Sequence, residues 1–125
     1  MGARVVVADD SSMLLALVVM SVQRAGHEPA TATNGEQALA LVREHRPDLL
    51  IVDALMPNMD GYDVCRALRE DEDGPKPYVL MLTAGVGEQD RKRAEEAGVD
   101  EFMTKPFSPG ERRERVREIL ASREA

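Results

Sequence analysis

The sequence contains little of several residue types whose abundance marks common protein classes. Its single cysteine, Cys65, excludes an internal disulfide and suits a reducing compartment. Basic residues number 16 against 23 acidic ones, and the net charge of −7 argues against non-specific binding to nucleic acid or to an anionic membrane. The longest hydrophobic run, residues 13–20, is far shorter than the roughly 20 residues that span a bilayer. We therefore expect a cytoplasmic protein without membrane insertion or direct nucleic-acid contact.

The signs of a multidomain or exported chain are also missing. No linker, internal repeat or low-complexity segment interrupts the 125 residues, a length that suits one domain with a single core. Residues 1–4 lead directly into the first predicted strand, so we expect no signal peptide. The sequence thus predicts a single domain over residues 1–125, with its core in about residues 4–121.

Short apolar runs alternate with helix signals five times along the chain. Strands are predicted over residues 4–9, 28–33, 49–53, 78–83 and 99–104, the second being poor in branched side chains. Helices are predicted over residues 12–25, 36–45, 61–71, 88–97 and from 109 onward, with N-cap candidates Ser11 or Ser12, Asp60 and Ser108. Such alternation with right-handed crossovers predicts an α/β fold: a doubly wound, five-stranded parallel sheet with helices on both faces.

Chemically capable side chains follow four of the predicted strands. The apolar run 49–52 leads straight into Asp53, and open parallel sheets bind their ligands at this carboxyl edge. Asp9 and Asp10, Thr83 and Lys105 occupy the ends of three other strands. Taken singly, each has an ordinary explanation as a helix cap, a turn residue or a solvated charge. Because the carboxyl ends of parallel strands share one edge, we expect these residues to converge.

The converging residue types favour phosphoryl chemistry. Three carboxylates repel one another unless a cation lies among them, and hard oxygen ligands select Mg²⁺. No histidine or cysteine lies at these strand ends, which argues against zinc. The Thr83 hydroxyl and the Lys105 ammonium complete a cradle for phosphoryl oxygens. An ionised aspartate beside Mg²⁺ is a competent nucleophile toward phosphorus, so an aspartyl phosphate on Asp53 is the expected product.

Four motifs are highly specific in combination: residues 7–10 (VADD), 51–61 (IVDALMPNMDG), 82–84 (LTA) and 102–107 (FMTKPF). In these motifs, over about residues 4–121, the chain resembles a response-regulator receiver domain, the phosphoacceptor module of two-component signalling, including the chemotaxis regulators. The resemblance implies the flavodoxin-like sheet order 2-1-3-4-5. It also implies that Asp53 accepts the phosphoryl group. Asp10 and Asp53 would bind Mg²⁺ directly, Asp9 through water, and Leu55 through its backbone carbonyl.

The resemblance assigns the remaining motif residues to phosphoryl contact and switching. Lys105 would contact the phosphoryl group, with a cis peptide bond between residues 105 and 106. Thr83 would move toward the phosphoryl oxygen on activation, while Phe102 changes between outward and inward positions. Ala84 is small, as access to the site requires. Phe102 itself departs from the tyrosine that many members carry, so the hydroxyl contact is lost.

A second departure concerns the final helix, which begins Glu111-Arg112-Arg113 where members commonly place apolar residues. Its packing on the sheet is therefore expected to start late, at Val116, Ile119 and Leu120. This puts in doubt any dimer that depends on the fourth and fifth helices, and we expect a monomer or a weak, phosphorylation-dependent dimer.

The first helix is apolar on more than one side. Leu14, Leu17, Val18 and Val22 are predicted to form the stripe on the sheet. A second apolar set consists of Leu15, Ala16, Val19 and Met20. Two explanations are open: the final helix covers the second set through Ile119 or Leu120, or the set is a docking surface for a phosphodonor protein.

Three functions are weighed. The resemblance favours a signalling module that catalyses only its own phosphorylation and dephosphorylation. It would receive phosphate from a histidine kinase or a histidine phosphotransfer protein and act on an unknown downstream target. A Mg²⁺-dependent phosphohydrolase would need a second acid close to the nucleophile, but Ala54 and Leu55 follow Asp53. A non-phosphorylated interaction domain of the same fold has no need of the intact acids, Thr83 and Lys105.

Overall fold

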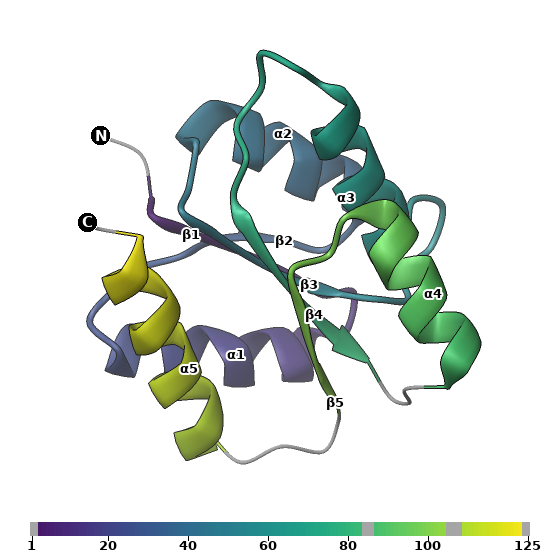
Figure 1. The fold of residues 1–125 in the computed structure, drawn as a ribbon. Coiled ribbons are helices and arrows are strands. Elements are labelled where there is room, and N and C mark those ends of the chain that lie inside the picture. Colours follow the sequence, from purple (N-terminus) through teal and green to yellow (C-terminus); the bar gives the residue numbers. More distant parts are fainter. Residues whose placement is uncertain (1–2, 84–86, 105–108, 124–125) are drawn as a thin grey trace.

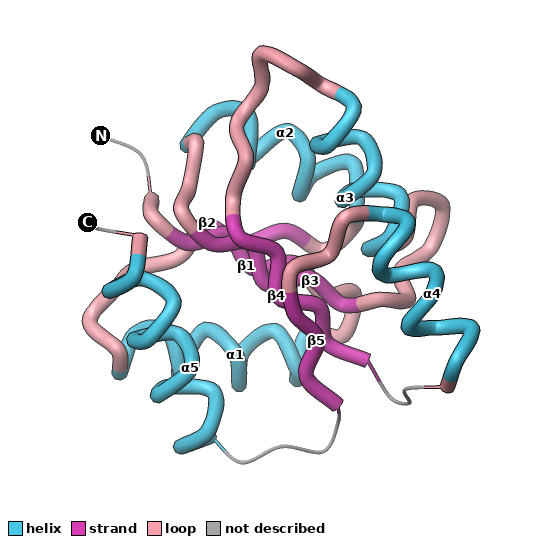
Figure 2. The backbone as a smooth tube through the Cα atoms, viewed as in Figure 1, coloured by secondary structure: helices cyan, strands magenta, loops and turns pink. Residues whose placement is uncertain are grey.

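The computed structural model describes residues 3–83, 87–104 and 109–123 of the chain. Within these ranges, strands and helices alternate from one end to the other (Figures 1 and 2). The strands are β1 (Val5–Ala8), β2 (Ala30–Ala32), β3 (Leu49–Asp53), β4 (Tyr78–Thr83) and β5 (Glu101–Thr104). The helices are α1 (Ser12–Arg24), α2 (Gly35–His45), α3 (Gly61–Glu70), α4 (Glu88–Ala97) and α5 (Pro109–Ser122). None of the helices in the described ranges is both long enough and apolar enough to cross a bilayer.

The strands form one parallel sheet in the order β2-β1-β3-β4-β5, which confirms the predicted fold class and strand order. β3 lies at the centre, between β1 and β4, and every one of its residues is buried. The register pairs Ala8 with Val52 and Asp53 with Leu82. The carboxyl ends of β1, β3 and β4 therefore reach the same edge of the sheet.

A helical layer covers each face of the sheet (Figure 1). Successive side chains of a strand point to opposite faces. Leu50 and Val52 accordingly lie in the apolar cluster under α2, α3 and α4, whereas Leu49 and Ile51 lie in the cluster under α1 and α5. Because both faces of β3 are buried, the strand requires the continuous apolar run that identified it in the sequence.

Helices α1 and α3 start at predicted caps, whereas Asn34 and Gly87, which were not predicted as caps, precede α2 and α4. The Ser11 hydroxyl accepts the N–H of Leu14 at 3.3 Å, and Asp60 accepts the N–H of Asp63 at 2.9 Å. Asp63 in turn accepts the N–H of Asp60 at 3.2 Å, which forms a reciprocal capping box. These bonds satisfy N–H groups that have no partner within the helix. The predicted cap Ser108 lies outside the described residues.

β2 begins later and ends earlier than predicted, and β5 begins later; at the end of β2 and the beginning of β5, neighbouring groups take the backbone donors. The N–H of Thr33 donates to the side-chain oxygen of Gln37 at 3.0 Å, and β2 ends before it. The N–H of Val99 donates to the carbonyl of Ala94 at 2.9 Å. That bond closes the end of α4, and β5 starts two residues later than the sequence indicated.

The buried face of α1 differs from the predicted stripe. Val18 and Val22 are buried as predicted, but Leu17 is 40% exposed. Leu15, predicted to lie on the outer face, packs against the cluster under α1 and α5. At about 100° per residue, positions 15, 18 and 22 share one face of the helix, whereas position 17 lies well away from it. The assignments of Leu15 and Leu17 were therefore wrong.

Helix α5 packs beside α1 (Figure 1). It covers part of α1, in agreement with the explanation that the final helix covers some of the second apolar set. Val116, Ile119 and Leu120 are buried, in line with the prediction. Arg112 is also buried, so α5 begins to pack a turn earlier than expected. Burial lowers the pKa of the Arg112 guanidinium, because removing it from water disfavours its charged form.

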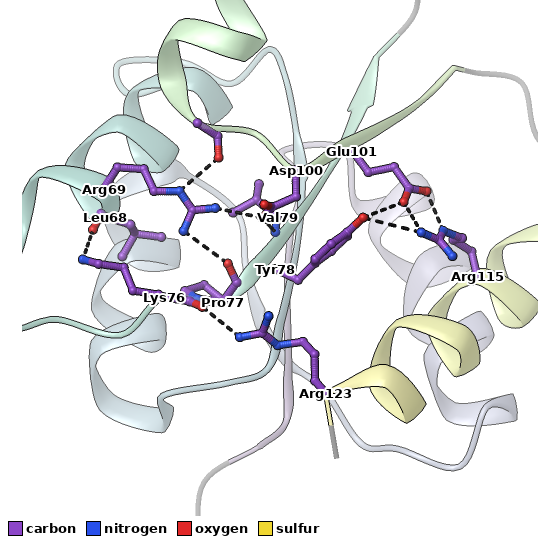
Figure 3. Close-up of polar contacts among 11 residues, drawn as sticks. Leu68, Arg69, Lys76, Pro77, Tyr78, Val79, Asp100, Glu101, Arg115 and Arg123 are labelled. Carbon is purple, nitrogen blue, oxygen red and sulfur yellow. Dashed lines mark hydrogen bonds and ion pairs between the residues drawn. The ribbon is translucent and has the colours of Figure 1, made fainter. Parts of the chain in front are cut away.

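Two groups of ion pairs fix the amino-terminal edge of β4 and β5, away from the predicted site (Figure 3). Arg69 of α3 pairs with Asp100 at 2.8 Å. On the other side of the sheet, Arg115 of α5 donates through Nε to Glu101 at 2.6 Å, and the Tyr78 hydroxyl donates to the same carboxylate at 2.8 Å. The hydrogen bond from Arg115 holds the pKa of Glu101 below its usual value. Each group joins one helical layer to the beginning of β5.

Candidate functional site

The three predicted acids converge at the carboxyl edge of the sheet. One carboxylate oxygen from each of Asp9, Asp10 and Asp53 lies within 4.8 Å of the others. Asp9 is 1% exposed and Asp53 7%, whereas Asp10 is open to solvent. The convergence follows from the pairing of β1 with β3, which brings the residues after Ala8 and Val52 together.

Backbone contacts hold Asp9 in place. Its Oδ1 accepts the N–H of Ser11 at 2.9 Å, and its own N–H donates to the carbonyl of Ala32 at 3.2 Å. Ser11 also caps α1, so the same short turn orients the acid and starts the helix. Asp10 lies between these two fixed residues and directs its carboxylate to the exposed side of the cluster.

A closed loop follows Asp53. The N–H of Gly61 donates to the carbonyl of Ala54 at 3.1 Å, which brings the two ends of the loop together. A Cβ at position 61 would lie only 2.5 Å from the carbonyl oxygen of Asp53, so glycine is required there for steric reasons. The side chain of Leu55, inside the loop, is 69% exposed. The end of the loop at Gly61 therefore packs directly against the backbone of Asp53.

The donor set of the cluster fits a hard cation. All three groups are carboxylates, and oxygen ligands of this kind suit Mg²⁺. Three like charges at this separation also repel one another unless a cation offsets them. The acids can thus hold a metal ion, as the sequence led us to expect.

Of the predicted switch residues, the structure describes Thr83, at the carboxyl end of β4, and Phe102, within β5. Thr83 ends β4, is half-buried, and is paired with Thr104 of β5. Phe102 packs against the cluster under α2, α3 and α4, and the guanidinium of Arg91 lies 5.6 Å from the centroid of its ring. Lys105, Ala84 and the peptide bond between residues 105 and 106 lie outside the described residues.

One contact near the site was missed in the sequence. Asp60 was predicted only as a cap, but its Oδ2 also pairs with Nη2 of Arg93 on α4, at 2.9 Å. The same guanidinium lies over the ring of Tyr62, 4.3 Å from its centroid. The partners are 33 positions apart in sequence, so no local pattern could have linked them.

Cys65 has no part in the site. It is buried in the core under α3, and desolvation raises the pKa of its thiol to about 11. The thiol is therefore protonated at neutral pH, and a buried, protonated thiol is unreactive.

Comparisons with known proteins agree with this geometry. The family model described as "Response regulator receiver domain" matches residues 5–117. The transcriptional regulatory protein PhoP of Bacillus subtilis is 38% identical over 120 residues, which cover 96% of this chain and 49% of PhoP. The chain thus spans about half the length of the curated relatives it matches.

Solved structures give the same result. A putative response regulator from Chloroflexus aurantiacus is 33% identical with a TM-score of 0.85, covering 97% of this chain and 99% of that one. The chemotaxis response regulator CheY4 of Vibrio cholerae is 30% identical with a TM-score of 0.85, covering 96% and 100%. The chain therefore belongs to the response regulator receiver domains of two-component signalling.

Proposed function

We propose that this receiver domain is switched by Mg²⁺-dependent phosphorylation of Asp53. The observation that carries the proposal is the convergence of carboxylate oxygens from Asp9, Asp10 and Asp53 within 4.8 Å. Asp53 is the member of this group that ends the central strand and is held by a fully buried run. A nucleophile needs such rigid placement, because misplacement by about 1 Å is costly in rate.

The acids divide the work of metal binding. Asp10 and Asp53 would bind Mg²⁺ directly, together with the backbone carbonyl of Leu55. Buried Asp9, whose Oδ1 already accepts the Ser11 N–H, would act through a water molecule. When bound, Mg²⁺ offsets the carboxylate charge and polarises the phosphoryl oxygens.

The chemical step transfers a phosphoryl group from a histidine of the donor to Asp53. A carboxylate oxygen of Asp53 forms the new bond to phosphorus, while the bond from phosphorus to the imidazole nitrogen breaks and that nitrogen keeps the electron pair. Lys105 and Thr83 contact the phosphoryl oxygens, and the small side chain of Ala84 leaves the approach open. Water later cleaves the acyl phosphate and releases inorganic phosphate. The domain acts only on its own phosphoryl group and is not a turnover enzyme.

The switch follows from the added charge. A phosphoryl group brings close to two negative charges beside Thr83. Thr83 moves toward it, Phe102 repacks, and the surface around α4 and β5 changes for a downstream target. The domain is a monomer or a weak dimer that depends on phosphorylation.

Response regulators partner with histidine kinases, and we assign this chain a histidine kinase or histidine phosphotransfer protein as its donor. The exposed apolar side chains of Met13, Leu17 and Met20 on α1, with Leu55 beside Asp53, form the docking surface for that donor. The module, one domain with its core in about residues 4–121, acts in the cytoplasm. The relative PhoP is a transcriptional regulatory protein, but we propose no direct DNA contact by this acidic domain.

Acetyl phosphate with Mg²⁺ tests the proposal. The parent protein should gain one phosphoryl group, stable in acid but labile to base and hydroxylamine, as detected by mass spectrometry. Asp53→Asn should gain none, whereas Asp73→Asn, an exposed acid on another loop, should be labelled as the parent is. Equal labelling of Asp53→Asn would refute the assignment. Catalytic release of phosphate from monoesters would instead indicate a phosphohydrolase, for which the apolar Ala54 and Leu55 provide no second acid.

A further inference from the structure

Helix α4 has an uneven attachment to the rest of the domain. Its buried side chains are Ala94 and Ala97, both in its second half. Residues 88–93, the first six of its ten residues, are all exposed. A methyl group buries little apolar area, at about 0.8 kcal/mol for a CH₂-sized group. The first half of α4 therefore depends on polar contacts for its position.

Two arginines supply contacts of this kind. Arg93 pairs with Asp60 at 2.9 Å and stacks over the ring of Tyr62 at 4.3 Å, so it joins α4 to the beginning of α3. Arg91 faces the ring of Phe102 on β5 at the longer distance of 5.6 Å. A guanidinium within about 6 Å of an aromatic centroid is attracted to the ring face. Arg93 makes the stronger attachment, since it combines an ion pair with a ring contact.

The other end of α4 is fixed. Nε of Arg69 donates to the carbonyl of Gly98 at 3.0 Å, and Asp100 accepts both Arg69 and the N–H of Val79, the latter at 2.7 Å (Figure 3). Gly98 has a φ of +83°, and a Cβ there would lie 2.7 Å from Cγ of Arg69. This close packing makes the carboxyl end of α4 a natural pivot.

The Arg93 contact reaches the loop that carries the site. Asp60 is the last residue before α3, and the loop between it and Asp53 contains Leu55. The N–H of Gly61 donates to the carbonyl of Ala54 and so closes that loop. A displacement of Asp60 would therefore also shift the short loop beside Asp53. Thr83 ends β4, the strand next to the one that carries Asp53, and lies four residues before Gly87, the N-cap residue of α4.

We propose that Arg93 is a positioning residue that latches α4 to Asp60 in the unmodified protein, and that occupation of the Asp53 site releases this latch while the Arg69 end holds. The inference rests on the proposed function and names a regulator of the same site. Since coupling between two sites is reciprocal, loss of the latch must favour occupation of the site.

The affinity for beryllium trifluoride with Mg²⁺, a non-covalent phosphoryl mimic, measures this coupling by calorimetry. Arg93→Gln should bind the mimic about threefold more tightly than the parent, the factor that an exposed ion pair of ordinary strength contributes. Asp60→Asn, which keeps an efficient cap, should shift the affinity in the same direction. The double variant should bind no more tightly than either single variant, because one contact is lost only once. Lys92→Gln, an equal charge loss on the same helix, should leave the affinity unchanged.

A simple charge effect predicts a different pattern, because the two single variants remove charges of opposite sign and would then shift the affinity in opposite directions. That result, or unchanged affinity in both, would overturn the latch. Amide hydrogen exchange without ligand tests the Arg93 latch independently of the proposed phosphorylation of Asp53. In Arg93→Gln the first half of α4 should exchange faster while Gly98 to Asp100 stays protected. If the parent fails to bind the mimic, the proposed function falls and the coupling with it. Normal binding by the parent with no faster exchange in Arg93→Gln overturns the latch alone.

Discussion

Replacement of Asp10 by asparagine should stabilise the metal-free protein. The carboxylate oxygens of Asp9, Asp10 and Asp53 lie within 4.8 Å of one another. Two unit charges at this distance repel by about 0.9 kcal/mol in bulk water and about 3.5 kcal/mol at an effective dielectric constant of 20. Asp10 is exposed, so each of its two repulsions lies close to the lower figure. Asp10→Asn should therefore gain about 1–2 kcal/mol in free energy of unfolding.

With Mg²⁺ present, the parent should instead be more stable than Asp10→Asn. A ligand present at a hundredfold excess over its Kd adds about 2.7 kcal/mol to the stability of the parent. Asp10→Asn lacks one of the proposed ligands, so it should gain much less. The variant is then more stable than the parent without Mg²⁺ and less stable with it, a crossing that no general effect of net charge produces.

Urea and thermal unfolding, followed by far-ultraviolet circular dichroism with and without Mg²⁺, measure both differences. A gain of 1 kcal/mol should raise the Tm by about 4 °C for a domain of this size. Asp73→Asn makes the same change in net charge on the loop before β4 and should show neither effect. Equal stability of parent and Asp10→Asn without metal would refute the repulsion. An equal gain with Mg²⁺ would exclude Asp10 as a ligand.

Three further predictions follow from other contacts. Gly61→Ala should lose about 1–3 kcal/mol of stability in urea and slow labelling by acetyl phosphate, because its Cβ would press on the backbone of the phosphoacceptor residue; unchanged labelling would contradict this. Glu101→Gln should lose about 1–2 kcal/mol at neutral pH. Arg115 lowers the pKa of Glu101, so the ionised Glu101 carboxylate contributes its full stability above the ordinary pKa of 4.5. This stability is lost as the pH falls through the folded-state pKa. The free energies of unfolding of parent and variant should therefore converge in acid. Leu17→Lys should fold and accept acetyl phosphate normally but receive phosphate from a protein donor at least about tenfold more slowly, a loss of about 1.4 kcal/mol, whereas Leu15→Lys should unfold, as measured by circular dichroism.

Features with a local cause could be predicted from the sequence. The run before Asp53 is apolar at every position because its strand is buried on both faces, and this pattern shows without any structure. Asp60 and Ser11 cap helices through bonds to residues three positions away, so short-range signals sufficed for them. The acid cluster then followed from topology, since parallel strands bring their carboxyl ends to one edge.

Features that depend on tertiary contacts could not be predicted. α1 is apolar around most of its circumference, so periodicity alone could not decide whether Leu15 or Leu17 faces the core. The burial of Arg112 depends on how α5 lies against its neighbours. The pairs Arg93–Asp60 and Arg69–Asp100 join residues more than thirty positions apart in sequence. In the sequence alone, each arginine is indistinguishable from an ordinary solvated charge.

The two acids at the beginning of β5 have a consequence for strand alignment. β5 is an edge strand of four residues, a kind of element that is prone to slip or to pair with another chain. Asp100 and Glu101 are consecutive, and each meets an arginine from the helical layer on a different face, Arg69 and Arg115. A slip of one residue would turn each acid toward the wrong face and break both pairs at once. The two consecutive acids, paired to opposite faces of the sheet, thus favour one register of this short strand, in addition to the packing of Phe102 and Met103.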